Sequence, residues 1–365
     1  MKNKDFLKLL FVGDIFPADL DFNIGFGIKS LFDQHQGNLW KPVLSALFKN
    51  ADLVIGNLES PLIPEAIKAK GSFYGSPVFA SFLKESGVTT LNIANNHILE
   101  QDDKGFESTL KELHQNQIDV IGSIENNQQK IVYKNMEGIK IAIAGFCNVD
   151  VLPDYHHKYF AVLNEENVFS ALQEMKSNNI DIKILSFHWG NEYIHQPSLE
   201  QRKLAYKCVE AGVDIIAGHH PHVIQPYEKY KEGHIFYSLG NFCFDNLQSI
   251  QTRTGMIASL YWDMQKKMFT NIHLQGIKLS PKILLQPIHT TKFKKYYDSI
   301  DRKYLQWKSI SDEKYACKYK KVLSIRHPIE RILMKLYLIK MLIVLPFSEK
   351  RKLIKNLINF YIYKH

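Results

Sequence analysis

The chain has 365 residues, 45% apolar and 23% charged, which is long enough to bury one large core or two modest ones. Its net charge of +9 would suit a nucleic-acid-binding protein, but residues 318 to 365 hold twelve Lys or Arg against two acidic residues. The rest of the chain is therefore close to neutral, so nucleic acid is not an expected partner.

The cysteines and the first residues of the chain bear on its compartment. The four cysteines lie far apart and form no C-x-x-C pair, which argues against a zinc ribbon or a disulfide scaffold and fits a reducing compartment. The apolar run before Asp14 is too short for a signal peptide or a spanning helix. We therefore expect a cytoplasmic protein.

Apolar runs alternate with amphipathic stretches along the chain, a pattern typical of α/β organisation. The expected strands cover residues 6–14, 51–59, 88–97, 118–123, 139–147, 181–190, 213–222 and 234–242. The expected helices cover residues 40–49, 77–86, 104–116, 165–177 and 198–211. Two later runs, 255–263 and 271–279, have a more alternating pattern that predicts an antiparallel pair.

Residues that bind metals or transfer protons stand at the ends of five expected strands. In chain order they are Asp14; Asn57 and Glu59; Asn96 and His97; His188; and His219, His220 and His222. Because the carboxyl ends of neighbouring strands in an open α/β sheet meet at one crevice, we expect one shared site. Oxygen ligands with imidazoles and without thiolate suit Mn²⁺, Fe or Zn²⁺.

Six stretches between residues 11 and 245 resemble, in order and spacing, the signature blocks of the CapA family of poly-γ-glutamate capsule biosynthesis proteins. They read "FVGD", "ADLVIGNLESPL", "NIANNHILE", "SFHWGNEY", "GHHPHVIQPYE" and "IFYSLGNFCFD". That family is similar to the calcineurin-like metallophosphoesterases. The resemblance implies a catalytic domain over residues 1–290, built as two β-sheets flanked by helices, and a helical basic extension over residues 291–365.

Residue by residue, the resemblance implies a site for two divalent metal ions. Glu59 would bridge the ions, with Asn57 in support, and His97 would donate a proton to the leaving group. The first ion would be held by Asp14 and His222, and the second by Asn96, His188 and His220. His219 is expected as a neighbour of the ligands, and Glu192, Asn241 and Asp245 as residues that support them or face substrate.

The resemblance implies a metal-dependent phosphoesterase-type hydrolase of a phosphorylated or polymer-related substrate, associated with capsule, poly-γ-glutamate or other cell-surface polymer biosynthesis. An alternative from another class is a non-catalytic, metal-stabilised subunit of a polymer synthesis or export complex. The sequence departs from the pattern in two places. Phe16 stands where many calcineurin-like enzymes have a ligand histidine, and Glu100 and Asp102 stand where the family has aspartate and then glycine.

The C-terminal extension carries its own signal. Residues 332–347 are apolar but contain Lys335 and Lys340, so they do not form the roughly 20-residue apolar run of a spanning helix. Residues 349–363 predict a helix with an apolar arc made of Leu353, Ile354, Leu357, Ile358, Tyr361 and Ile362. Two interpretations stay open: the arc packs on the protein or on a partner copy, or it makes peripheral contact with the inner face of a membrane.

Overall fold

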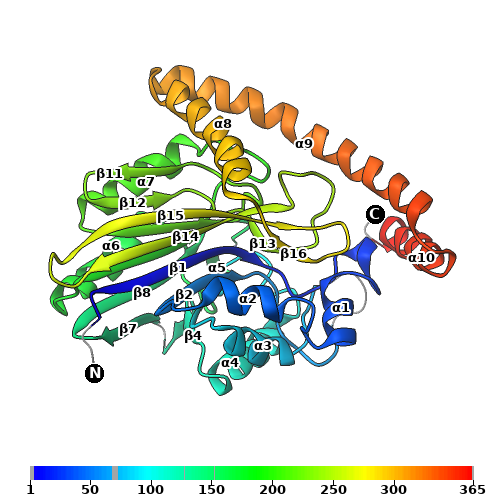
Figure 1. The fold of residues 1–365 in the computed structure, drawn as a ribbon, viewed down its shortest axis with the longest axis horizontal. Helices are drawn as coiled ribbons and strands as arrows, with labels where there is room; N and C mark the ends of the chain where they lie inside the picture. The colour runs from blue at the N-terminus through cyan, green and yellow to red at the C-terminus, as the bar shows by residue number, and fades with distance from the viewer. Residues whose placement is uncertain (1–3, 68–72, 127, 152, 364–365) are drawn as a thin grey trace.

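The computed structural model describes residues 4–67, 73–126, 128–151 and 153–363. Two β-sheets pack face to face, and helices cover the outer face of each sheet (Figure 1). This arrangement confirms the predicted α/β sandwich with helices on both sides.

The first sheet has the strand order β16-β15-β14-β1-β2-β3-β4, with β13 paired to β1 beyond this path. Strands β1 to β4 run parallel to one another, and β14 and β15 form the antiparallel pair that the alternating runs predict. The bounds are β1 (Phe6–Ile15), β2 (Leu53–Leu58), β3 (Thr90–Asn92), β4 (Asp119–Ile121), β13 (Asn241–Cys243), β14 (Thr254–Asp263), β15 (Met268–Leu279) and β16 (Leu285–Pro287).

The second sheet has the order β11-β12-β10-β9-β8-β7, with β8, β9, β10 and β12 parallel. Its bounds are β7 (Ile131–Met136), β8 (Ile139–Cys147), β9 (Ile182–His188), β10 (Ile215–His219), β11 (Tyr227–Tyr230) and β12 (Gly233–Phe236). A separate short hairpin is formed by β5 (Ile124–Glu125) and β6 (Gln128–Gln129).

The helices of the sandwich lie on its two outer faces or in loops. They are η1 (Asp21–Asn23), α1 (Ile28–His35), α2 (Lys41–Phe48), α3 (Val78–Ser86), α4 (Asp102–Gln115), α5 (Pro153–His156), α6 (Glu165–Ser177) and α7 (Leu199–Glu210). The α7 helix begins with a capping box, in which Ser198 and Gln201 each satisfy a backbone amide of the other.

Strand β1 shows how the sequence builds the layers. Because successive strand side chains point to opposite faces, Leu9 and Phe11 enter the core between the sheets, while Leu10 and Val12 face the helices of the first sheet. Gly13 follows because a side chain there would meet the carbonyl oxygen of Gly240 at 1.8 Å. The chain thus reaches Asp14 at the end of the most central strand.

Three expected strands are wrong in their extent. The run 88–97 contains only β3, the run 213–222 contains only the five residues of β10, and the third run belongs to two sheets. The run 234–242 is divided into β12 of the second sheet and β13 of the first, with Gly240 between them at φ +66°. The apolar run is continuous because the whole segment is buried, with side chains in the core between the sheets and in the cores under the helices. The interruption comes from the chain crossing from one sheet to the other.

The C-terminal extension consists of α8 (Thr290–Lys308), α9 (Asp312–Val344) and α10 (Phe347–Tyr363). In Figure 1, α8 and α9 form a hairpin along the top of the sandwich, and α10 lies beside η1. Glu228 anchors α8, because its buried carboxylate accepts hydrogen bonds from Tyr304 at 2.5 Å and from Lys308. Among the helices that the structure describes, none combines the length and apolar character needed to cross a bilayer.

Candidate metal centre

The site lies where the carboxyl ends of the two parallel strand sets meet. In the first sheet, Asp14 of β1 stands in register with Asn57 of β2. In the second sheet, His188 of β9 stands in register with His219 of β10. The loops after β2 and β10 then add Glu59, His220 and His222, so that residues far apart in sequence come together as the strand-end pattern predicts.

Two groups of side chains have the geometry of a metal site. Asp14, Glu59 and His222 place one possible ligand atom each within 4.8 Å of the others. His222 lies between the two carboxylates, with Nδ1 3.6 Å from Asp14 Oδ2 and Nε2 3.7 Å from Glu59 Oε1. All three side chains are buried.

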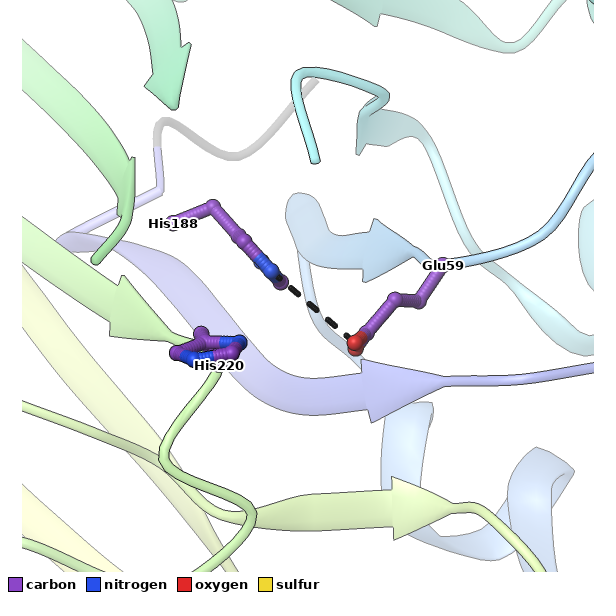
Figure 2. A group of neighbouring side chains, drawn as sticks. All are labelled: Glu59, His188 and His220. Carbon is purple, nitrogen blue, oxygen red and sulfur yellow. Dashed lines mark ion pairs between the residues drawn. The ribbon is translucent and has the colours of Figure 1, made fainter. Parts of the chain in front are cut away.

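The second group consists of Glu59, His188 and His220, again with possible ligand atoms within 4.8 Å of one another. Figure 2 shows the three side chains pointing toward one another, with His188 Nε2 3.9 Å from Glu59 Oε1. The rings of His188 and His220 are 5.0 Å apart, centre to centre. Glu59 belongs to both groups and therefore stands where a bridging ligand would stand.

Unpaired polar atoms in the site fit cations. Among the residues that the structure describes, Glu59 Oε1 and His220 Nδ1 are buried and have no hydrogen-bond partner, and the same is true of both ring nitrogens of His219. Buried polar atoms are normally satisfied, so atoms such as these indicate a missing partner such as an ion. Buried carboxylate and imidazole donors without thiolate fit Mn²⁺, Fe or Zn²⁺.

An amide network holds the two carboxylates in place. Asn57 Nδ2 donates to Asp14 Oδ1 at 2.9 Å and lies 3.3 Å from Glu59 Oε2. Asn57 Oδ1 in turn accepts from Asn92 at 3.2 Å and Asn95 at 3.4 Å. Asn92 is a residue that the sequence reasoning missed, although it stands in the "NIANNH" block. The one feature of the sequence that could have indicated its role is that a polar residue stands in a short apolar strand.

Protonation in the site is governed by burial and by charges within it. Burial raises the pKa of Glu59 well above its usual value, and the neighbouring charge of Asp14 adds to this. Burial also acts to raise the pKa of Asp14, but the neighbouring His219 and His222 rings outweigh it and hold that pKa well below its usual value. The carboxyl groups of Asp14 and Glu59 are therefore buried next to each other, and a cation between them would stabilise the ionised form of both.

The histidines divide according to their partners. Burial lowers the pKa of His220 to about 3 and that of His188 well below its usual value, with further lowering from neighbouring histidines. For His222, burial acts in the same direction, but the Glu59 carboxylate and Asp14 outweigh it and raise the pKa to about 10. His188 and His220 are thus neutral, the form in which imidazole binds a metal.

Asn96 and His97 lie at the edge of the second group. Asn96 Oδ1 is 2.8 Å from His188 Nε2, which places its amide beside the ring of His188. His97 Nε2 is 3.2 Å from Asn96 Nδ2, and its Nδ1 is 3.0 Å from Glu100 Oε1. Glu100, one of the departures from the family pattern, therefore orients the predicted proton donor.

The other departures have simple structural roles. Phe16 stacks on Phe244 with ring centres 4.2 Å apart, and Phe244 also contacts the ring of His222 at 4.8 Å. An aromatic wall thus stands where another ligand histidine was the usual residue. Asp102 is the first residue of α4.

The four remaining predicted residues take different positions. His219 Nδ1 lies 3.3 Å from Asp14 Oδ1, and Asn241 Oδ1 lies 3.0 Å from His222 Nδ1 and orients that ring. Glu192 is half-buried, and its charge contributes to the raised pKa of His222. Asp245 instead interacts with Asn23 at 3.1 Å and accepts a hydrogen bond from the amide of Leu20.

The extension also contacts Tyr193, a neighbour of the ligand His222, which the sequence did not suggest. On α9, Arg326 donates to the carbonyl oxygen of Tyr193 at 3.1 Å, and the His327 ring is 6.0 Å from the Tyr193 ring. Tyr193 lies 6.2 Å from His222, centre to centre. Neither α9 residue stands in any of the six blocks, so no motif pointed to them.

Solved structures with a similar chain trace include two described as phosphatases or phosphoesterases. A novel phosphatase from Mycoplasma pneumoniae has a TM-score of 0.49 and 18% identity, covering 81% of this chain and 99% of that one. The calcineurin-like phosphoesterase YfkN from Bacillus subtilis has a TM-score of 0.47 and 13% identity, covering 83% and 98%. With TM-scores below 0.5, neither structure lends a site or an activity to this chain.

Sequence relatives are more informative. The chain is 35% identical over 253 residues to the capsule biosynthesis protein CapA of Bacillus anthracis, covering 66% of this chain and 60% of that protein. It is 32% identical over 256 residues to the PGA biosynthesis protein CapA of Bacillus subtilis, covering 66% and 64%. The matches thus span about three fifths of the relatives' length. The sequence profile of the bacterial capsule synthesis protein family, PGA_cap, matches residues 8–246, which contain both ligand groups. The chain therefore belongs to the PGA_cap family of bacterial capsule synthesis proteins.

Proposed function

We propose that this protein is a hydrolase of the phosphoesterase type that uses two divalent metal ions and serves the synthesis of a capsule, poly-γ-glutamate or another cell-surface polymer. The observation that carries the proposal is the position of Glu59 in two buried ligand groups at once. A carboxylate shared in this way can hold two neighbouring metal ions at once, as a two-metal hydrolase needs. The names of the CapA relatives support the link to a capsule polymer.

The ligands divide between two sites. Asp14 and His222 would hold one ion, and His188, His220 and Asn96 the other, with Glu59 shared. When bound, two such ions lower the pKa of a water molecule and stabilise negative charge on phosphoryl oxygens. Mn²⁺, Fe and Zn²⁺ all suit this donor set.

Side chains of the protein would supply the proton for the leaving group and hold the metal ligands in position. Glu100 fixes Nδ1 of His97, so the Nε2 side of the ring faces Asn96 and the second ligand group. From there His97 would give a proton to the oxygen that leaves phosphorus, which is general acid catalysis. Asn241 and Asn57 keep His222 and the two carboxylates oriented while this occurs.

The test is a hydrolysis assay on the purified full-length protein. The protein is stripped with a chelator, reloaded with Mn²⁺, Fe²⁺ or Zn²⁺, and assayed on a phosphomonoester and a phosphodiester. We expect turnover that needs added metal and is lost in Glu59→Gln but kept in Glu107→Gln, whose carboxylate is exposed on α4. Binding of two ions without turnover on any phosphoester would contradict the hydrolase and favour the non-catalytic, metal-stabilised subunit.

A further inference from the structure

The outer face of α9 carries a row of exposed apolar side chains. We call this row the α9 stripe; it consists of Ile325, Ile329, Ile332, Leu336, Ile339 and Ile343. Their exposed fractions run from 39% to 71%. Steps of four and three residues keep all six on one face of a helix, along a length of about 27 Å. Contiguous exposed apolar surface of this kind marks an interaction site.

The opposite face of α9 is packed, so the helix cannot turn the stripe inward. Tyr315 and Tyr319 are buried against the sandwich, and the Tyr315 hydroxyl donates to the carbonyl oxygen of Pro197 at 2.6 Å. Further along, Arg326 is bonded to Tyr193, and Glu330 is buried. The stripe is thus held outward by contacts along the first half of the helix.

The charges beside the stripe identify the kind of partner. Lys335 and Lys340 are exposed and lie on either side of it, and Arg331 is exposed as well. The acidic residue within this segment, Glu330, is paired with Arg326 at 2.5 Å and so does not balance them. A partner must therefore offer an apolar surface together with negative charge.

We propose that the α9 stripe lies in the surface of an anionic lipid bilayer, with Lys335 and Lys340 against the head groups. Apolar side chains bordered by lysine are what a helix in the membrane interface requires. A second copy of the chain is disfavoured because it would bring its own lysines against these. The proposal does not depend on the reaction at the metal centre.

The proposal places the membrane surface on α9, whereas the sequence pointed to residues 349–363. In α10, Leu353 is buried and Asn356 donates to the carbonyl oxygen of Ile24 at 2.9 Å, so part of the expected apolar arc packs on the protein. Ile354 and Ile358 are exposed, and the side chains of Tyr361 and Ile362 lie outside the described residues. Contact of residues 349–363 with a membrane stays a prediction.

The test is co-sedimentation of the full-length protein with vesicles of phosphatidylcholine alone or with 30% phosphatidylglycerol. We expect binding to the anionic vesicles, weakened by added salt, and at least about tenfold weaker for the double variant Leu336→Glu, Ile339→Glu. The matched control is Leu305→Glu on α8, where the leucine is 55% exposed against 56% for Leu336. Lys335→Glu should weaken binding by about fivefold or more.

Three outcomes would overturn the proposal. The first is absence of anionic vesicle binding at low salt by the wild-type protein, and the second is equal binding by the stripe variant and the control, with circular dichroism confirming that both are folded. The third is a dimer in sedimentation velocity that the stripe variant abolishes and that does not bind vesicles, which would assign the stripe to a second copy.

Discussion

The sandwich buries charged and polar side chains, whereas the C-terminal extension exposes apolar ones. The sandwich buries Asp14, Glu59 and His188 completely, whereas α9 exposes Ile332 and Ile343. Partners of the buried polar groups must be small enough to enter the protein, as metal ions are. The partner of an exposed apolar row must be a large surface outside it. The sandwich therefore indicates a site that binds metal ions, and the extension indicates a surface that binds a large partner.

The largest effect that we predict concerns the sandwich alone. His97→Ala removes the proposed proton donor but no residue of the two ligand groups, so turnover should fall by about 10² to 10⁴-fold while both metal ions stay bound. The measurement is the rate constant for phosphoester hydrolysis together with metal content. The control is His114→Ala, which removes an exposed histidine from α4. Unchanged turnover in His97→Ala would remove His97 from the mechanism.

The second prediction concerns the junction between the two regions. Glu228→Ala leaves Tyr206, Tyr304 and Lys308 without their common carboxylate, so the free energy of unfolding should fall by about 3 kcal/mol. The measurement is chemical denaturation. The matched control is Glu210→Ala, because Glu210 also pairs with a lysine and a tyrosine but is exposed, so its loss should cost far less stability than the loss of Glu228. Equal losses would show that α8 is not anchored by Glu228.

The third prediction separates α10 from the rest of the extension. Leu353→Ala removes a buried side chain from the α10 contact with η1, so opening of α10 should become easier by about 2–3 kcal/mol. Hydrogen exchange of the α10 amides measures this. Ile354→Ala is the control, since the neighbouring side chain is 46% exposed. If both variants exchange like the wild type, α10 is not held by its apolar face.

The smallest effect is a dependence of stability on pH within the sandwich. Burial lowers the pKa of His234 to about 4, with a further contribution from Lys229, and Tyr227 lies 3.0 Å from its Nδ1. Between pH 6.5 and 4 the unfolded chain binds a proton that the folded chain does not, so the free energy of unfolding decreases as the pH is lowered through this range. The expected loss is about 2 kcal/mol at pH 5. His234→Gln should remove this part of the pH dependence in thermal unfolding curves, and an unchanged pH profile would contradict it.

The sequence allowed much of the sandwich to be predicted, because burial on both faces leaves continuous apolar runs in parallel strands. Strands β1, β8 and β9 follow the expected ranges closely, and so do α2, α3, α6 and α7. The division between β12 and β13 could not be predicted, since burial is the same before and after the crossing between sheets. Edge strands such as β7 were not predicted because they contain exposed polar residues and so lack a continuous apolar run.

The candidate site was open to prediction where strand ends carry unusual residues, as at Asp14, His188 and His220. Asn92 gave little signal because its role is a hydrogen bond to another amide, Asn57. The contact of Arg326 with Tyr193 depends on how α9 packs, which no local pattern encodes. The exposed face of α9 could not be predicted for the same reason. The sequence shows that the helix is rich in apolar residues, but tertiary packing decides which of its faces stays exposed.

The most direct test of the two-metal centre is the number of metal ions per chain, measured by mass spectrometry of the purified protein after reloading and dialysis. We predict two divalent ions in the wild type and in Glu107→Gln, and fewer than one in Glu59→Gln, because Glu59 belongs to both ligand groups. A wild-type protein that holds one ion or none, or a Glu59→Gln variant that keeps two, would contradict the proposed metal centre.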